Sequence, residues 1–425
     1  MLYIRGHKII KGYIGNTPVS HVGFGKSGLI KIKSENGGSD STNNLIARYT
    51  ANTSGVLPTF NSGYQYTINE TESNGVYTVE LFSDDDFTTC SFNGKTQLLT
   101  VDYLKVTSKV TNMSNMFNGC SSLTTIGNVS NWVTDNVTLM NHMFNNCQKL
   151  TQLDVSNWVT SSSTNMANIF YNCSSLTQLD VSNWDTGKVA NMDNMFRNCS
   201  KLPQVDVSNF DTSQVTSMGA MFQNCYLVTR LDVSNWVTDK VTSMGSMFNG
   251  CSRLTTIGDV SNWVTNKVKR MDYMFNYCSS LTQLDVSNWD TGNVYNMSNM
   301  FAGCSQLTQL VVSNFNTSTV TNMSNMFNGC KSLTTLNVSN FNTSKVTNMT
   351  NFIVNASALQ NFISCAIPVS FEASGTALTH DSLMSIINNL ATVTTTQTLT
   401  LGSTNLAKLS SEEKAIVTNK GWTLV

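Results

Sequence analysis

The stretch LTQLDVSNWDTGKVANMDNMFRNC, residues 176–199, combines two hydrophobic periods in one short segment. Its first half reads L-x-x-L-x-V, and the last two apolar residues alternate as they do in a short strand with one buried face. In the second half, Val189 and the apolar residues up to Cys199 fall at i, i+3, i+6, i+7 and i+10, which is typical of one face of a helix. Asp185 or Thr186 can cap the start of that helix. The stretch therefore predicts a strand, a turn and a short helix.

The same pattern recurs along the chain with a period of 26 or 27 residues, which its cysteines mark. They are Cys120, Cys147, Cys173, Cys199, Cys225, Cys251, Cys278, Cys304 and Cys330. The residue before eight of these nine cysteines is Gly or Asn, which tolerate the left-handed conformation that ends a helix. One unit alone cannot fold, because ordering its backbone costs about 1 kcal/mol per residue and its few apolar side chains do not offset that cost. Neighbouring units must therefore share their apolar faces in a stacked array.

The unit LxxLDVSN(W/F)DTxxVTNMxNMFxxC resembles the repeat of BspA-like leucine-rich-repeat surface proteins over about residues 100–365. The resemblance implies an α/β repeat solenoid of leucine-rich-repeat type, with one short strand and one short helix per 26-residue unit. The strands would form a parallel sheet on one side of the solenoid and the helices would cover the other. In that family the repeats are associated with adhesion and binding rather than with catalysis.

Shifts in composition divide the chain into five segments. We expect a small β attachment module at 1–33, a polar linker at 34–44, an N-terminal β cap at 45–100, the solenoid at 101–365 and an α/β C-terminal cap at 366–425. In the N-terminal cap, the strand-like runs at 75–83 and 88–104 are expected to pair. In the C-terminal cap we expect helices over 380–391 and 410–421 and strands over 396–402 and 422–425. Ser410 and Glu413 have the spacing of a capping box at the second helix.

The charge balance and the N-terminus bear on partners and location. With 25 basic and 26 acidic residues the net charge is −1, which argues against nucleic acid or an anionic membrane as the main partner. No run reaches the roughly 18 apolar residues that a membrane helix needs, so no membrane insertion is expected. The chain starts at Met, and its first residues, MLYIRGHKIIKGYIG, have no apolar core of a secretion signal. The segment KGYIGNTPVSHVGFG at 11–25 resembles short N-terminal modules of bacteriophage structural proteins.

Three repeated columns are interpreted as architecture. The cysteines could form disulfides or bind metal, but no C-x-x-C pair occurs, so we expect buried, structural thiols and neither a metal nor a cofactor. An aromatic column could stack on sugars, but Trp interchanges with Phe, which favours a core or turn-edge stack in which volume matters rather than the indole N–H. That column is Trp132, Trp158, Trp184, Phe210, Trp236, Trp263, Trp289, Phe315 and Phe341. One asparagine per unit precedes each of these residues, from Asn131 to Asn340, and predicts an amide ladder that satisfies the turn backbone.

The residue between the second Leu and the Val of each unit gives the candidate interaction face. Alternation points it away from the core, and it is acidic in six consecutive units. The face, named here the Asp–Ser face, comprises Asp154, Asp180, Asp206, Asp232, Asp259 and Asp285, with Ser156, Ser182, Ser208, Ser234 and Ser287 beside them. Carboxylates about 5 Å apart repel by roughly 0.8 kcal/mol in water, so the column is tolerable in solvent. Three readings stay open: a solvated face, a face that binds polar groups of a glycan or a protein, and a row of Ca²⁺ sites.

The sequence predicts a binding protein rather than an enzyme. The four histidines lie far apart, and no catalytic constellation can be identified. We expect a virion appendage, a phage head or tail fibre component that binds other virion proteins through its N-terminus and a host-surface glycan or protein through its repeats. The alternative is a bacterial cell-surface adhesin of the BspA-like type, and a homo-oligomer is left open. A sugar-active enzyme would need convergent acids that the sequence does not show.

Overall fold

The structure is a computed structural model that describes residues 44–425 and, before them, only the backbone of six short strands. These strands are β1 (Leu2–Ile4), β2 (His7–Ile9), β3 (Tyr13–Ile14), β4 (Thr17–Pro18), β5 (Val22–Phe24) and β6 (Ile30–Ile32). They form three antiparallel pairs, β1 with β2, β3 with β4 and β5 with β6. All but the last residue of the predicted linker at 34–44 lies outside the described residues.

A five-stranded sheet precedes the repeats and joins them through one parallel pair. Its strands are β7 (Leu45–Ala51), β9 (Thr67–Ser73), β10 (Val76–Phe82), β12 (Leu98–Leu104) and β13 (Thr125–Ile126), in the order β13-β12-β7-β10-β9. The short strands β8 (Thr59–Phe60) and β11 (Cys90–Ser91) pair separately. The two runs expected to pair become β10 and β12, but β7 lies between them. Because β13 belongs to the first repeat and is parallel to β12, the sheet continues directly into the array.

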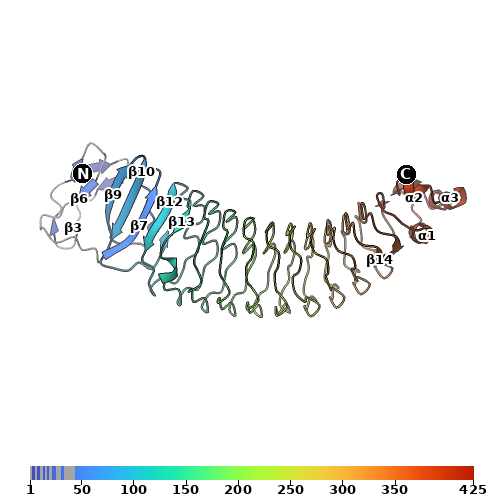
Figure 1. The fold of residues 1–425 in the computed structure, drawn as a ribbon, viewed down its shortest axis with the longest axis horizontal. Coiled ribbons are helices and arrows are strands. Elements are labelled where there is room, and N and C mark those ends of the chain that lie inside the picture. Colours follow the sequence, from blue (N-terminus) through green and yellow to red (C-terminus); the bar gives the residue numbers. More distant parts are fainter. Residues whose placement is uncertain are drawn as a thin grey trace.

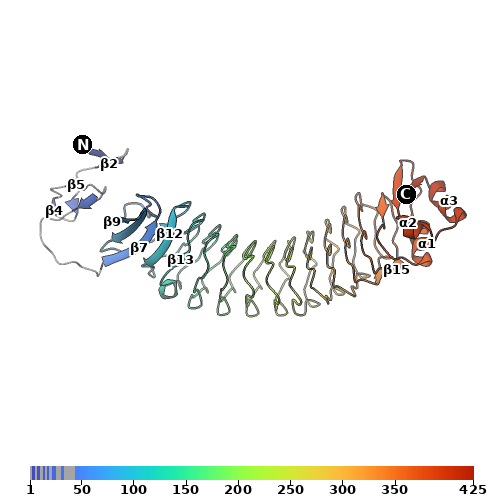
Figure 2. The same cartoon turned by 45° about the horizontal axis from the view of Figure 1, so that its top comes forward.

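The repeat units stack side by side in a long, curved row between this sheet and the C-terminal helices (Figure 1). Figure 2 shows the same row from a second direction. Equivalent residues of neighbouring units form parallel bridges, for example Asn165 with Asn191 and Asn191 with Ser217. Within the array only β13, β14 (Thr335–Asn337) and β15 (Asn361–Ile363) are long enough to count as strands, and η2 (Val129–Asn131) is a 3-10 turn. The molecule is thus a repeat protein with short strands and few helices.

The helix predicted in each repeat unit is wrong. In its place the chain makes successive turns, because alternate N–H groups donate to the next unit instead of to the residue four positions back. The N–H of Asn168 donates to Asp193 O (2.9 Å) and that of Phe170 to Met195 O (3.0 Å). Asn168 and Asn172 also have a left-handed φ of +59°, which an α-helix cannot contain. Two left-handed residues in each unit therefore divide the predicted helix into turns.

The apolar face predicted for that helix is nevertheless the core of the array. In the unit quoted above, Val189, Met192, Met195, Phe196 and Cys199 have no exposed surface. The phenylalanines of successive units stack with ring centroids 5.4 to 5.9 Å apart between Phe117 and Phe327. Burial depends on which side chains face inward, and turns at this spacing bring the same side chains inward as a helix would.

The Trp/Phe column is buried, as expected for a core stack, and its residues are at most 4% exposed. The ring centroids of Trp158 and Trp184 lie 6.2 Å apart with parallel planes. The expectation that only volume matters needs correction, because five of the six array indoles donate their N–H to a valine carbonyl of the preceding unit. Trp184 Nε1 to Val155 O is 3.2 Å, for example. Tryptophan therefore adds an inter-unit hydrogen bond that Phe cannot make.

The C-terminal segment forms the predicted helices and strands. Its elements are β16 (Phe371–Glu372), α1 (His380–Asn389), β17 (Gln397–Thr400), α2 (Ser403–Leu406), α3 (Ser411–Asn419) and β18 (Trp422–Leu424), of which β16 and α2 were not predicted. The three strands are parallel, in the order β16-β17-β18. Ser410 and Glu413 make the expected capping box. No helix in the described part of the chain combines the length and the apolar character needed to cross a membrane.

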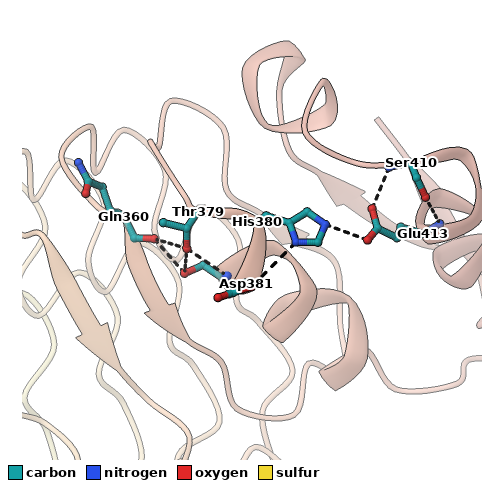
Figure 3. Close-up of polar contacts among 7 residues, drawn as sticks. Gln360, Thr379, His380, Asp381, Ser410 and Glu413 are labelled. Atoms are coloured by element: carbon teal, nitrogen blue, oxygen red, sulfur yellow. Dashed lines mark hydrogen bonds and ion pairs between the residues drawn. The ribbon is translucent and has the colours of Figure 1, made fainter.

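A histidine connects the first and third helices (Figure 3). Thr379 caps α1 by accepting from the N–H of Ser382. His380 Nε2 lies 2.8 Å from Glu413 Oε1, while the other oxygen of Glu413 accepts from the Ser410 N–H at 2.8 Å. The hydrogen bond from Ser410 and the nearby His380 lower the pKa of the Glu413 carboxyl. One carboxylate thus serves the start of α3 and its contact with α1.

Candidate functional site

The six carboxylates of the Asp–Ser face lie on the outside of the array. Five of them are exposed and Asp232 is half-buried. Four of them follow a buried leucine, Asp206 follows the buried Val205 and Asp259 follows Gly258. Each precedes a buried valine, so the alternation expected from the sequence places them outward. In the next two units the equivalent residues are Val311, which is exposed, and Asn337, so the column of carboxylates ends at Asp285. The structure therefore brings the predicted residues together along one line of equivalent positions.

Each aspartate is fixed by the serine two residues later. Ser182 donates its N–H (3.0 Å) and its hydroxyl (2.7 Å) to Asp180 Oδ1. The same pair of bonds forms at Asp154, Asp206, Asp232 and Asp285, and at Asp259 the Ser261 N–H donates. These bonds use Oδ1 alone, so Oδ2 is the oxygen available to a partner. The serine beside each aspartate is therefore a turn partner of the carboxylate.

These hydrogen bonds favour the ionised form of four of the six carboxylates. The bonds from Ser182 lower the pKa of Asp180, and those from Ser287 lower the pKa of Asp285. The pKa values of Asp232 and Asp259 are lowered in the same way. Repulsion from Asp259 acts in the opposite direction on Asp285, but it is the weakest influence there. At Asp285 the stabilisation by Ser287 thus outweighs the repulsion from the neighbouring carboxylate.

Other corners of the unit use the same device. Asp185 Oδ1 accepts from the Gly187 N–H (3.0 Å), and Asn191 Oδ1 accepts from the Asp193 N–H (2.9 Å). The first of these corners is acidic only in some units, and Asn316 and Asn342 occupy the same place further along. Asp and Asn thus turn the chain at several corners, but only the Asp–Ser face presents a carboxylate in six consecutive units.

The cysteine column is structural, as predicted, and has an additional role. All eleven cysteines are free and buried. Each array thiol lies 3.1 to 3.2 Å from a phenylalanine carbonyl of the preceding unit, as Cys173 does from Phe144 O, and donates to it. Burial raises the pKa of the Cys225 thiol to about 12, so it stays protonated. Within the described residues no three His, Cys, Asp or Glu side chains gather in a group that could hold a metal ion.

Two ladders of polar side chains differ from the expectation. The column from Asn131 to Asn340 is exposed, and only Asn209, Asn314 and Asn340 donate to a serine carbonyl of the preceding unit. A buried column of threonines, which was not predicted, instead bonds to the backbone carbonyls of the adjoining unit. Thr186 Oγ1 donates to Asp211 O at 2.9 Å, and Thr134, Thr160, Thr212, Thr238, Thr265, Thr291, Thr317 and Thr343 make equivalent bonds. The recurrent Thr after each W-x or F-x was the available signal.

The chain is similar to a solved structure and to a protein family. A solved structure described as the functional domain of InlJ from Listeria monocytogenes, which includes a cysteine ladder, matches at 15% identity and a TM-score of 0.20. The match covers 74% of this chain and 75% of the other. No match was found among curated proteins.

The family comparison covers the repeats. The family described as "Mycoplasma protein of unknown function, DUF285" matches residues 89–204, 176–284 and 278–367. These matches overlap into one continuous segment that exceeds half of the chain and coincides with the stacked units. They do not extend to residues 1–33, so the phage-like interpretation of that segment stays a prediction. By its repeats, the chain belongs to the DUF285 family.

Proposed function

We propose that this chain is a non-enzymatic adhesion-type protein, a leucine-rich-repeat-like solenoid that binds a partner through its Asp–Ser face. The observation that supports this most is the recurrence of an outward carboxylate in six consecutive units, four of which have a lowered pKa. A single surface carboxylate binds weakly, but a line of them creates a continuous negative strip. Such a strip fits a partner that carries a row of cationic groups or hydroxyl donors.

The fixed geometry of each aspartate adds to this proposal. Because Ser182 holds Asp180 Oδ1, the carboxylate is already ordered before a partner arrives, and little side-chain entropy is lost on binding. The free Oδ2 atoms repeat at the spacing of the units. A repetitive partner, either a glycan or an extended protein segment, would meet the same contact at each step.

The location and the attachment of the protein are part of the proposal. Residues 1–33 would dock the chain to a phage particle, with the repeats directed at the host surface. The resemblance of residues 11–25 to virion modules supports this docking. The second candidate is an adhesin on a bacterial surface, which the resemblance of the repeat sequence to that of BspA-like proteins favours.

Neutralising the face tests its role without disturbing the turn. Asn337 already accepts from Ser339 in this column, so Asp180→Asn, Asp206→Asn and Asp232→Asn should retain the local bonds. The triple variant and the wild-type chain are compared for binding to envelopes of the bacterium concerned. A loss of about tenfold or more in affinity is expected. The matched control is Asp185→Asn, Asp211→Asn and Asp290→Asn, which removes the same charge at another corner. Equal losses in the two variants would show that net charge, not this face, is recognised.

The attachment proposal has its own test. The full chain and a chain lacking residues 1–43 are immobilised and exposed to disrupted virions and, separately, to cell envelopes. Capture of a capsid or tail protein by the full chain alone supports attachment to a particle. Envelope binding by both chains, with no capture of virion protein, favours the cellular adhesin.

A further inference from the structure

One repeat unit carries tyrosine at both of its left-handed positions. Tyr273 has a φ of +57° and Tyr277 a φ of +56°. Glycine or asparagine occupies most equivalent positions in the other units, and His142, Ala220 and Ser246 are the exceptions. A bulky aromatic residue adopts this conformation only at an energetic cost, and such costs concentrate where a site requires them. Both rings are nevertheless exposed, Tyr277 by 64% and Tyr273 by 39%.

The two tyrosines border a groove of about 770 Å³ that continues across the next units. The ring of Tyr277 covers the backbone of Gly303, where a Cβ atom would lie only 2.8 Å from Tyr277 Cδ1. Gly303 and Gly329 form a floor without side chains, and Asn299 and Asn328 lie along it. The volume falls in the range of about 300–1,000 Å³ that is usual for small-ligand sites.

We propose that this groove binds a neutral polysaccharide, with one sugar ring stacked on Tyr277 and its hydroxyl groups bonded to the asparagine amides. The lining consists mainly of amide, hydroxyl and glycine groups beside the two aromatic rings. An aromatic face accepts the apolar side of a sugar ring, and amides both donate to and accept from hydroxyl groups. Asn276, which is 7% exposed, is held in place by its bond to Asn249 Oδ1 (3.0 Å), so part of the amide lining is preorganised.

The same lining disfavours other ligand classes. Lys331 is its only charged residue, whereas a phosphate-rich ligand needs several cations. The lining also includes no Leu, Ile, Val, Met, Phe or Trp side chain that would form an apolar pocket for the anchors through which peptides bind. None of the lining residues belongs to the Asp–Ser face, so binding here does not depend on that face.

The test uses the full chain with three soluble probes, a glucan, a mannan and a galactan, and measures affinity by titration calorimetry. We expect at least one of them to bind, and Tyr277→Asn to weaken that binding about tenfold, since a lost stacking contact is worth about one power of ten. Asparagine is the residue that other units use here, so the fold should be retained. Gly329→Asn fills the floor, where a Cβ would have no contact closer than 3.7 Å, and should also weaken binding.

Two controls distinguish this site from a general effect. Tyr226→Ser removes another tyrosine, 46% exposed and outside the groove, and should leave the affinity unchanged. The Asp180→Asn, Asp206→Asn and Asp232→Asn variant should also bind the polysaccharide normally, even if adhesion through the Asp–Ser face is wrong. Nitration of Tyr277, followed by mass spectrometry, should fall on addition of the polysaccharide while that of Tyr226 does not. The proposal is overturned if no probe binds, if Tyr277→Asn binds as tightly as wild type, or if only gelatin, used as a peptide probe, binds.

Discussion

The two halves of the array share one core but differ on one edge, at the left-handed residue before each cysteine. After Gly119 in the first unit, this residue is Asn146, Asn172, Asn198 and Asn224, and then it becomes Gly250, Tyr277, Gly303 and Gly329. In the first half the amides bond across units, Asn172 Nδ2 to Asn146 Oδ1 at 2.7 Å and Asn224 Nδ2 to Asn198 Oδ1 at 2.8 Å. In the second half the missing side chains leave the groove. A repeat can therefore change its surface at a single position while its interior stays constant.

If the core is the same in both halves, equivalent core truncations should lower the free energy of unfolding by equal amounts. Phe196→Ala and Phe301→Ala each remove a fully buried ring that stacks on two others. We expect each to lower the free energy of unfolding by about 3–5 kcal/mol. Urea denaturation of the two variants measures this. A difference of more than 1.5 kcal/mol or so between them would mean that the halves differ inside as well.

The asparagine edge should stabilise the first half. Asn172→Ala removes the amide bond to Asn146 and places alanine at a φ of +59°. Together these changes should cost about 2 kcal/mol, measured by thermal or urea unfolding. Asn172→Gly is the control, since glycine tolerates the backbone and loses only the hydrogen bond. If the glycine variant is as unstable as the alanine variant, the left-handed backbone is not the cause.

Replacing the tyrosine on this edge of the second half should instead stabilise the protein. Tyr277→Asn relieves a bulky residue from its left-handed conformation and exposes little buried apolar surface, since the residue is already 64% exposed. The free energy of unfolding should rise by about 1 kcal/mol. A fall instead would show that the contact of the ring with Gly303 outweighs the backbone strain.

The Asp–Ser turns should respond to pH equally in the two halves. Because the folded-state pKa of Asp180 and Asp285 is lowered, each contributes stability above the unfolded pKa of about 3.9 and loses it as the pH falls through the folded value. Ser182→Ala and Ser287→Ala should each raise the pKa of the adjacent carboxyl toward its ordinary value. NMR titration of the carboxyl carbons measures both shifts. Unchanged pKa values in the variants would contradict the assigned cause.

The period and the inward face could be predicted from the sequence, because burial follows from the spacing of Val189, Met192 and Phe196 in a single unit. The absence of a helix could not be predicted, because the acceptors that compete for its N–H groups belong to the next unit. Asp193 O, which accepts from the Asn168 N–H, lies 25 residues away in sequence. No periodicity within one unit reveals them. The outward place of the aspartates followed from alternation, but their bonds to serine needed the turn geometry.

The residues before the array cysteines carried a signal for the groove, and only part of it was used in the prediction. Eight of the nine residues before the array cysteines are Gly or Asn, and the ninth is Tyr277. The eight predicted the left-handed backbone correctly. The exception marked the candidate binding site, but it became meaningful only once the exposure of Tyr277 and the glycine floor beside it were known.

The thiol ladder has a consequence for how such proteins change in length. Every array cysteine donates to a carbonyl one unit back, and five of the six array indoles and the buried threonines also bond to the adjoining unit rather than within their own. A duplicated unit would thus find its donors and acceptors already in place on both sides. Recombination between such similar segments of the gene could lengthen or shorten the molecule without redesigning it. The reach of the protein would then change in fixed steps, each the thickness of one unit.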